Sequence, residues 1–295
     1  MGIREDIEFN VNGERIAAWF YYPDGPKPYK AMVLAHGLGA TKECSLDQYA
    51  LRFQEAGYAV LVFDYRGFGD SGVKDKKLAQ LISVRRQLQD WRGAIDYLRT
   101  RNDIDHSNIG IWGTSFSGGH VLKIASQDPR IKVVISQIPN VDTFASISLI
   151  EPKTQPIRLA IAGIKDLIMT ILGRPGYSIP IVGEPGELAM LSSSDAMPGL
   201  LSISPETGIN STPARSNLLL PLYRPITSVK KIKCPVLYCI AKQDKEVSSK
   251  KALTAAGKTA NATVKEYEGG HFAPYNPPLF ETVIKDQLEY LKENL

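Results

Sequence analysis

Three short segments carry the residue types of nucleophilic acyl chemistry, in the chain order serine, aspartate, histidine. The first is the run GTSFSGG at 113–119, which follows an apolar, strand-like stretch. Small residues around a serine at a strand-to-helix corner are typical of the nucleophile elbow, a tight turn that exposes the hydroxyl. Ser117 stands where the usual pattern has glycine, but a serine is small enough for the turn. We therefore predict that Ser115 is a catalytic nucleophile.

The second segment ends at Asp244. The apolar run from Val236 to Ala241 is typical of a buried parallel strand, and Asp244 follows its carboxyl end. An aspartate there can orient a histidine and stabilise its imidazolium. It can equally brace a turn or cap the helix expected to begin near Ser248. Position alone leaves both interpretations open.

The third segment is the glycine-rich loop around His271, after a strand-like stretch at 264–267. Two glycines directly before the histidine allow the loop to bend its ring back over the sheet. The other histidines fit less well: His106 is expected on the surface, His120 packed on the helix after Ser115, and His36 behind a glycine-rich turn. The prediction is a Ser115, Asp244, His271 triad.

The turn HGLG at 36–39 follows an early strand and supplies candidates for an oxyanion hole. Acyl transfer requires fixed N–H donors where negative charge develops on the substrate oxygen. We expect the backbone N–H groups of Leu38 and Phe116 to be these donors. The spacing lacks the third glycine of a dinucleotide-binding loop, so no such cofactor is expected. The three cysteines come without clustered histidines, so no metal is expected either.

Together the elbow, the HGLG turn, the segment DYRGFGDSG at 64–72, Asp244 and the run GHF at 270–272 resemble the α/β-hydrolase superfamily. The resemblance is strongest to the subgroup of dienelactone hydrolase, the X-Pro dipeptidyl-peptidase-like esterases and the fungal polyketide transferases. It implies an α/β-hydrolase fold, a Ser-Asp-His triad and ester or thioester chemistry. The 64–72 segment is expected to be a connector, although Tyr65 could line the acyl pocket.

The elements that would position these residues alternate along the chain. A hairpin is expected from 7 to 22 with its turn at Asn12-Gly13, strands at 31–35, 59–63 and 133–136, and helices at 46–56 and 82–98. Such alternation predicts an α/β fold with a mostly parallel central sheet and helices on both faces.

The alternation stops between residues 141 and 225, a proline-rich stretch with one amphipathic helix expected at 157–172. Its many leucine, isoleucine and methionine residues favour a packed element over a disordered insert. We expect a cap at 141–225, inserted into a core formed by 1–140 and 226–295, which closes an apolar acyl pocket over Ser115.

Composition fits an enzyme of this kind. The 295 residues are 43% hydrophobic, and 35 basic against 31 acidic residues give a net charge of +4 without a basic patch that would favour nucleic acid. No apolar run reaches the roughly 20 residues that span a bilayer, and no secretory leader is evident. The expected location is cytoplasmic, without membrane attachment, and a homodimer is possible.

The sequence thus predicts a serine hydrolase that cleaves carboxylic esters of small to medium acyl chains through an acyl-enzyme. The substrate is expected to be a small-molecule ester or thioester. An acyltransferase or thioesterase using the same triad is the alternative. A non-catalytic binding protein on a hydrolase scaffold is a further alternative from another class.

Overall fold

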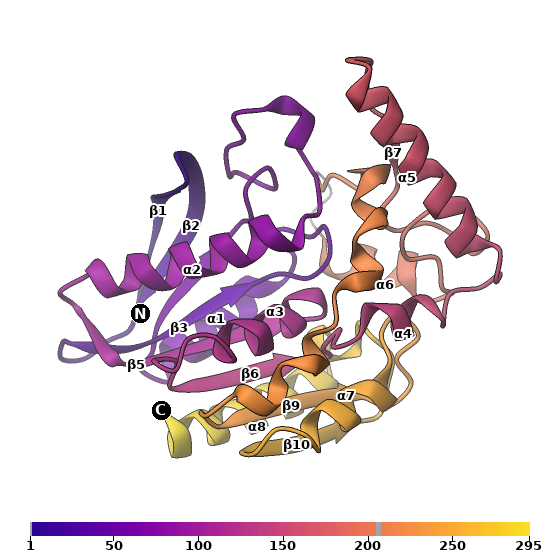
Figure 1. The fold of residues 1–295 in the computed structure, drawn as a ribbon. Coiled ribbons are helices and arrows are strands. Elements are labelled where there is room, and N and C mark those ends of the chain that lie inside the picture. Colours follow the sequence, from indigo (N-terminus) through magenta and orange to yellow (C-terminus); the bar gives the residue numbers. More distant parts are fainter. Residues whose placement is uncertain (1, 205–207) are drawn as a thin grey trace.

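A twisted eight-stranded sheet runs through the molecule, which we describe from a computed structural model for residues 2–204 and 208–295 (Figure 1). The strand order is β1-β2-β4-β3-β5-β6-β9-β10. β1 and β2 are antiparallel, as are β2 and β4, and the other neighbours are parallel. The strands are β1 Ile3–Val11, β2 Glu14–Tyr22, β3 Tyr29–Ala35, β4 Ala59–Phe63, β5 Ile104–Thr114, β6 Val133–Gln137, β9 Val236–Ala241 and β10 Ala262–Tyr267.

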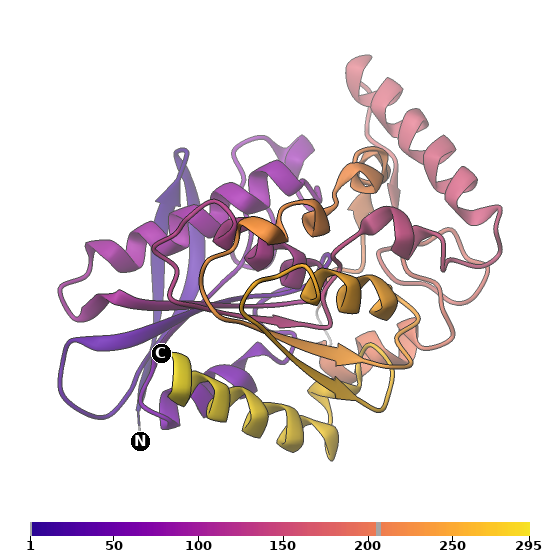
Figure 2. The ribbon, with the colours of Figure 1, turned by 60° about the horizontal axis from the view of Figure 1, so that its bottom comes forward.

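Helices cover both faces of the sheet (Figure 2). Helices α2, α3 and α7 pack on one face, and α1 and α8 on the other. The covering helices are α1 Leu46–Glu55, α2 Val84–Thr100, α3 Phe116–Ala125, α7 Ser249–Ala256 and α8 Leu279–Asn294. The predicted mostly parallel α/β fold is confirmed.

Strand β4 shows why the sequences of the central strands are uninterrupted apolar runs. All five of its side chains are buried, and they alternate between the two sides of the sheet. Leu61 and Phe63 join the core under α2 and α3, whereas Val60 and Val62 join the core under α1 and α8. A strand covered on both faces therefore has no polar position. At the sheet edge, Asn12 and Gly13 both adopt positive φ, which is what a two-residue hairpin turn requires.

The segment between β6 and β9 carries more structure than the single helix expected there. It contains α4 Thr143–Ile147, α5 Gln155–Ile171, α6 Ala196–Ile203, the short strands β7 Ser178–Ile179 and β8 Thr212–Pro213, and several 3₁₀ turns. The chain leaves the core at Val141 and returns at Ile226, whose N–H donates to the Val141 carbonyl at 2.9 Å. Asp166, which breaks the apolar pattern of α5, is fully buried and accepts hydrogen bonds from Arg215.

One face of α5 is apolar and exposed, on a helix that extends away from the sheet at the upper right of Figure 1. Ile157, Ile161, Ile164, Ile168 and Ile171 are between 51% and 75% exposed. Their alternating spacing of four and three residues places them in one stripe along the helix. Within the described residues, no helix is both long and apolar enough to cross a membrane.

The connector after β4 is fixed by buried charges. Arg66 is almost fully buried, pairs with Asp90 through its Nε, and donates to Glu14 Oε2 at 3.1 Å. Burial raises the pKa of Asp90 to about 6, although Arg66 opposes that rise. The pairs join the connector to α2 and to the hairpin, so the connector prediction for this segment holds.

Replacing Arg66 with methionine should destabilise the fold by about 3–5 kcal/mol, because Asp90 would remain buried without its cation and Glu14 would keep only Arg86. The midpoint of urea unfolding would report the loss. The matched control is Lys285→Met, which removes an exposed lysine 3.9 Å from exposed Glu289 and should cost less than about 1 kcal/mol. Equal midpoints for the two variants would contradict the bracing role of Arg66.

Candidate active site

Ser115 occupies the one-residue corner between β5 and α3, at φ 55° and ψ −116°. This strained conformation requires small neighbours. A Cβ on Gly113 would collide with the Ser117 carbonyl, and a Cβ on Gly119 would collide with the Asn140 carbonyl. The corner is also tethered, since Ser115 N donates to Gln137 O and Asn140 N donates to Ser115 O, both at 2.9 Å.

Ser117, the departure from the usual elbow glycine, has a partner of its own. Its hydroxyl hydrogen-bonds to the hydroxyl of Tyr65, which also accepts a hydrogen bond from Trp91 Nε1 at 2.8 Å. All three side chains are buried. The expectation that Tyr65 could line the acyl pocket is wrong, because its ring lies under the elbow with its hydroxyl committed to this network. The turn accommodates a Cβ at 117 by giving its hydroxyl a buried partner.

Asp244 lies in the loop between β9 and α7 and uses its two oxygens differently. Oδ1 accepts from the backbone N–H groups of Glu246 at 2.8 Å and Val247 at 2.9 Å. Oδ2 lies 2.7 Å from His271 Nδ1. Asp244 thus braces the turn through Oδ1 and contacts His271 through Oδ2, while its catalytic role stays a prediction.

His271 completes a chain of hydrogen bonds to the elbow. Its Nε2 lies 2.9 Å from Ser115 Oγ, on the side of the ring opposite Asp244. Gly269, at φ 126°, allows the loop after β10 to turn back in this way. If the neutral imidazole donates from Nδ1 to Asp244, its Nε2 is free to accept the serine proton. The structure thus brings Ser115, Asp244 and His271 together.

Electrostatics distinguish His271 from the other buried histidines. Burial disfavours its imidazolium, but the charge and hydrogen bond of Asp244, together with the charge of Glu246, outweigh burial and raise the pKa of His271. Burial lowers the pKa of His36 to about 4 and that of His120 to about 3. His120, bonded to Tyr223 and Gln87, is packed as expected.

The two candidate oxyanion donors flank the nucleophile. Phe116 is the first residue of α3, and the first N–H groups of a helix have no intrahelical acceptor. Leu38 borders the same cavity as Ser115. Gly37 permits the close approach of that turn, since a Cβ there would lie 3.0 Å from the Ser115 Cβ. His36 Nδ1 lies 3.1 Å from the Gly37 carbonyl oxygen and supports the turn from behind.

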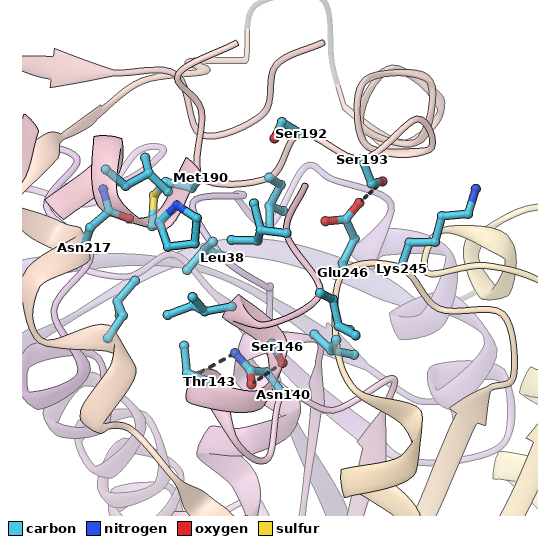
Figure 3. A pocket seen from close by; sticks show the side chains of 18 of the residues that line it. Leu38, Asn140, Thr143, Ser146, Met190, Ser192, Ser193, Asn217, Lys245 and Glu246 are labelled. Atoms are coloured by element: carbon cyan, nitrogen blue, oxygen red, sulfur yellow. Dashed lines mark hydrogen bonds between the residues drawn. The ribbon is translucent and has the colours of Figure 1, made fainter. Parts of the chain in front are cut away.

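A cavity of about 630 Å³ opens beside Ser115 (Figure 3). Its apolar walls include Leu149, Ile150, Met190 and Leu191 from the segment between β6 and β9. The isoleucines of the exposed stripe of α5 are not among the residues that line it. A second cavity of about 40 Å³ also borders Ser115, and His271 lines it.

The polar part of the large cavity was not predicted from the sequence. Ser192, Ser193 and Glu246 lie together on its wall in Figure 3, and Asn140 and Ser146 lie elsewhere on it. Glu246 lies in the same loop as Asp244, two residues further along, so its place near the site could have been predicted from the sequence. No local signal marks the two serines, which come from a distant segment.

Comparisons with known proteins agree with the fold. The family model described as "Serine aminopeptidase, S33" matches residues 26–273. The quorum-quenching protein AidA of Acinetobacter baumannii is 39% identical, over 97% of this chain and 94% of its own. The polyketide transferase af380 of Aspergillus fumigatus is 26% identical, over 99% of both chains.

Among solved structures, the α/β hydrolase GrgF from Penicillium sp. sh18 superposes with a TM-score of 0.83 at 22% identity, over 99% of both chains. This likeness concerns the fold. The family match, by contrast, extends over most of the sequence and includes the segments of Ser115, Asp244 and His271. The chain therefore belongs to the serine aminopeptidase S33 family of α/β-hydrolases.

Proposed function

We propose that this hydrolase cleaves carboxylic esters of small to medium acyl chains through a Ser115, His271, Asp244 triad. The observation that carries the proposal is the continuous hydrogen-bonded path from Asp244 through His271 to Ser115 at the edge of an apolar cavity. Residues 141–225 would form the cap over a core of 1–140 and 226–295, because side chains from that segment supply much of the cavity wall.

In the proposed reaction, His271 Nε2 accepts the proton of Ser115 as Oγ attacks the substrate carbonyl. The N–H groups of Leu38 and Phe116 stabilise the oxyanion, a contribution worth about 2.7–4 kcal/mol for one donor in comparable sites. The imidazolium, stabilised by Asp244, then protonates the leaving group. Water, activated by the same histidine, releases the acid from the acyl-enzyme.

Acyl transfer is the second candidate, and the full-length similarity to a polyketide transferase favours it. The same triad would form the acyl-enzyme from an ester or thioester, and an alcohol, amine or thiol would replace water. Product analysis with an added acceptor separates the two reactions. Accumulation of the transferred product at the expense of the free acid would identify a transferase.

Removal of the Ser115 hydroxyl should abolish turnover. Ser115→Ala is expected to lower kcat for p-nitrophenyl butyrate by at least about 10⁴-fold. Ser126→Ala, which removes a hydroxyl from the far end of α3, serves as the control and should keep wild-type activity. A fluorophosphonate should label the wild type but not Ser115→Ala. Absence of both labelling and turnover in the wild type would favour a binding protein instead.

The pH profile should report the raised pKa of His271. Neutral imidazole is the active base, so kcat/KM is expected to fall as the pH drops through an inflection above 6.5. Asp244→Asn should move that inflection to lower pH, since it removes the charge that favours the imidazolium, and should lower kcat by about 10⁴-fold. His36 and His120 titrate too low to account for this limb. A wild-type inflection below 6.5 would refute the assignment.

We further propose that two copies pair through the isoleucine stripe of α5. Apolar residues spaced alternately four and three positions apart form a narrow stripe on a helix. A stripe of this kind packs against the matching stripe of a second helix, as in a coiled coil. The nearby cations do not oppose such contact. Arg158 donates to the Gly186 carbonyl at 3.0 Å, and Lys165 Nζ lies 4.1 Å from the centre of the Tyr177 ring, so both turn toward their own chain.

Sedimentation velocity tests the pairing. The wild type should sediment as a dimer, and Ile164→Glu should weaken association by at least about tenfold, because each pairing would bury two carboxylates in the seam. Leu253→Glu places the same charge on an exposed leucine of α7 and should leave the dimer intact. A monomeric wild type at micromolar concentration would exclude this assembly.

A further inference from the structure

A polar region near the loop of Asp244 interrupts the apolar wall of the large cavity (Figure 3). It comprises Glu246, from the loop that carries Asp244, and Ser192 and Ser193, from the chain just before α6. Glu246 is 8% exposed and Ser192 is 5% exposed. These three residues, called here the polar corner, neither transfer a proton nor bind the oxyanion in the proposed reaction.

Glu246 lacks a cationic partner among the described residues. Within that part of the chain, its carboxyl makes one hydrogen bond, to the hydroxyl of Ser193. The neighbouring Lys245 does not pair with it, since its Nζ turns to Ser194 at 3.0 Å and Asp195 at 2.9 Å. Burial raises the pKa of Glu246. A buried carboxyl that keeps unused acceptor capacity costs free energy unless a ligand uses that capacity.

Ser192 supplies the second, independent observation. Its Oγ is buried and has no hydrogen-bond partner among the residues that the structure describes, although the residue lines the cavity. A serine hydroxyl can donate one hydrogen bond and accept others. The corner therefore presents an underused acceptor on Glu246 and an unused donor on Ser192.

The cavity with the polar corner fits the acyl side of the substrate. His271 must reach the leaving group to protonate it, and His271 lines the small cavity of about 40 Å³. The large cavity borders Ser115 and Phe116. Its volume of about 630 Å³ lies within the usual range for small-molecule sites. An acyl chain that fills it would pass beside the polar corner.

We propose that the polar corner binds a hydroxyl group on the acyl chain, so that the preferred substrates are esters or thioesters of hydroxylated acids. This inference rests on the proposed function. A hydroxyl matches both groups, because it donates to Glu246 and accepts from Ser192. An ammonium group could only donate, and the apolar walls would add a larger desolvation cost. A carboxylate would be repelled by Glu246.

The test compares methyl octanoate with its 3-hydroxy, 6-hydroxy and 8-hydroxy derivatives. At least one hydroxylated ester should exceed methyl octanoate in kcat/KM by about tenfold or more, as expected for a hydrogen bond to a charged group. Glu246→Gln and Ser192→Ala should each reduce this ratio several-fold. The ratio is the readout because the charge of Glu246 also acts on His271, and that effect cancels between substrates.

Ser146→Ala is the matched control. Ser146 lines the same cavity, but its hydroxyl is already bonded to Asn140 and to the Asp142 carbonyl. The substrate ratio should therefore stay at the wild-type value. A preference for methyl 8-aminooctanoate over the hydroxylated esters would overturn the hydroxyl assignment in favour of a cation.

Binding to Ser115→Ala separates this inference from the proposed reaction. Calorimetry should show tighter binding of the preferred hydroxylated ester than of methyl octanoate, and Ser115→Ala/Glu246→Gln should lose the difference. Equal binding of all four esters would overturn the inference even if Ser115-dependent hydrolysis is found. Selective binding without turnover would support the polar corner and contradict the hydrolase proposal alone.

Discussion

The positive φ of Ser115 is the constraint on which the rest of the site depends. A residue with a Cβ adopts such a conformation at a cost of about 1–3 kcal/mol, and it persists only where the surroundings enforce it. Here the backbone of Ser115 is bonded on both sides, to Gln137 and to Asn140. Glycines at 113 and 119 clear the space that the turn needs. Once the corner is fixed, the hydroxyl stands at the carboxyl edge of the sheet, where the loops after β9 and β10 can reach it.

Much of this arrangement could be predicted from the sequence, because its signals are local. The bounds of β4 and β9 follow from short apolar runs, and the hairpin turn from Asn12-Gly13. Parallel strands end at one edge, so polar residues that follow such strands must gather there. That reasoning selected Ser115, Asp244 and His271. In the structure, His271 lies within hydrogen-bond distance of both Asp244 and Ser115. Their catalytic roles, and those of Leu38 and Phe116, stay predictions.

The remainder depends on contacts between distant segments, which periodicity does not encode. Helix α6 contains Pro198 and Gly199, so its local sequence argues against a helix and tertiary packing decides. Asp166 looked like an interruption of an apolar helix but is buried against Arg215. Likewise, the pairing of Glu246 with Ser193 requires the path of the whole segment between β6 and β9. Composition predicted an apolar cavity but could not reveal which side chains face it.

The hydrogen bond between Ile226 and Val141 has a consequence for how such proteins diversify. It joins the two points where the segment between β6 and β9 leaves the core and returns to it. The entropic cost of closing a loop grows only slowly with its length, so insertions between Val141 and Ile226 carry a small thermodynamic cost. Strands β6 and β9 pair directly with each other in the sheet, so their register does not depend on the length of the segment that connects them. The segment that lines the cavity can therefore vary in length and sequence without disturbing the turn at Ser115.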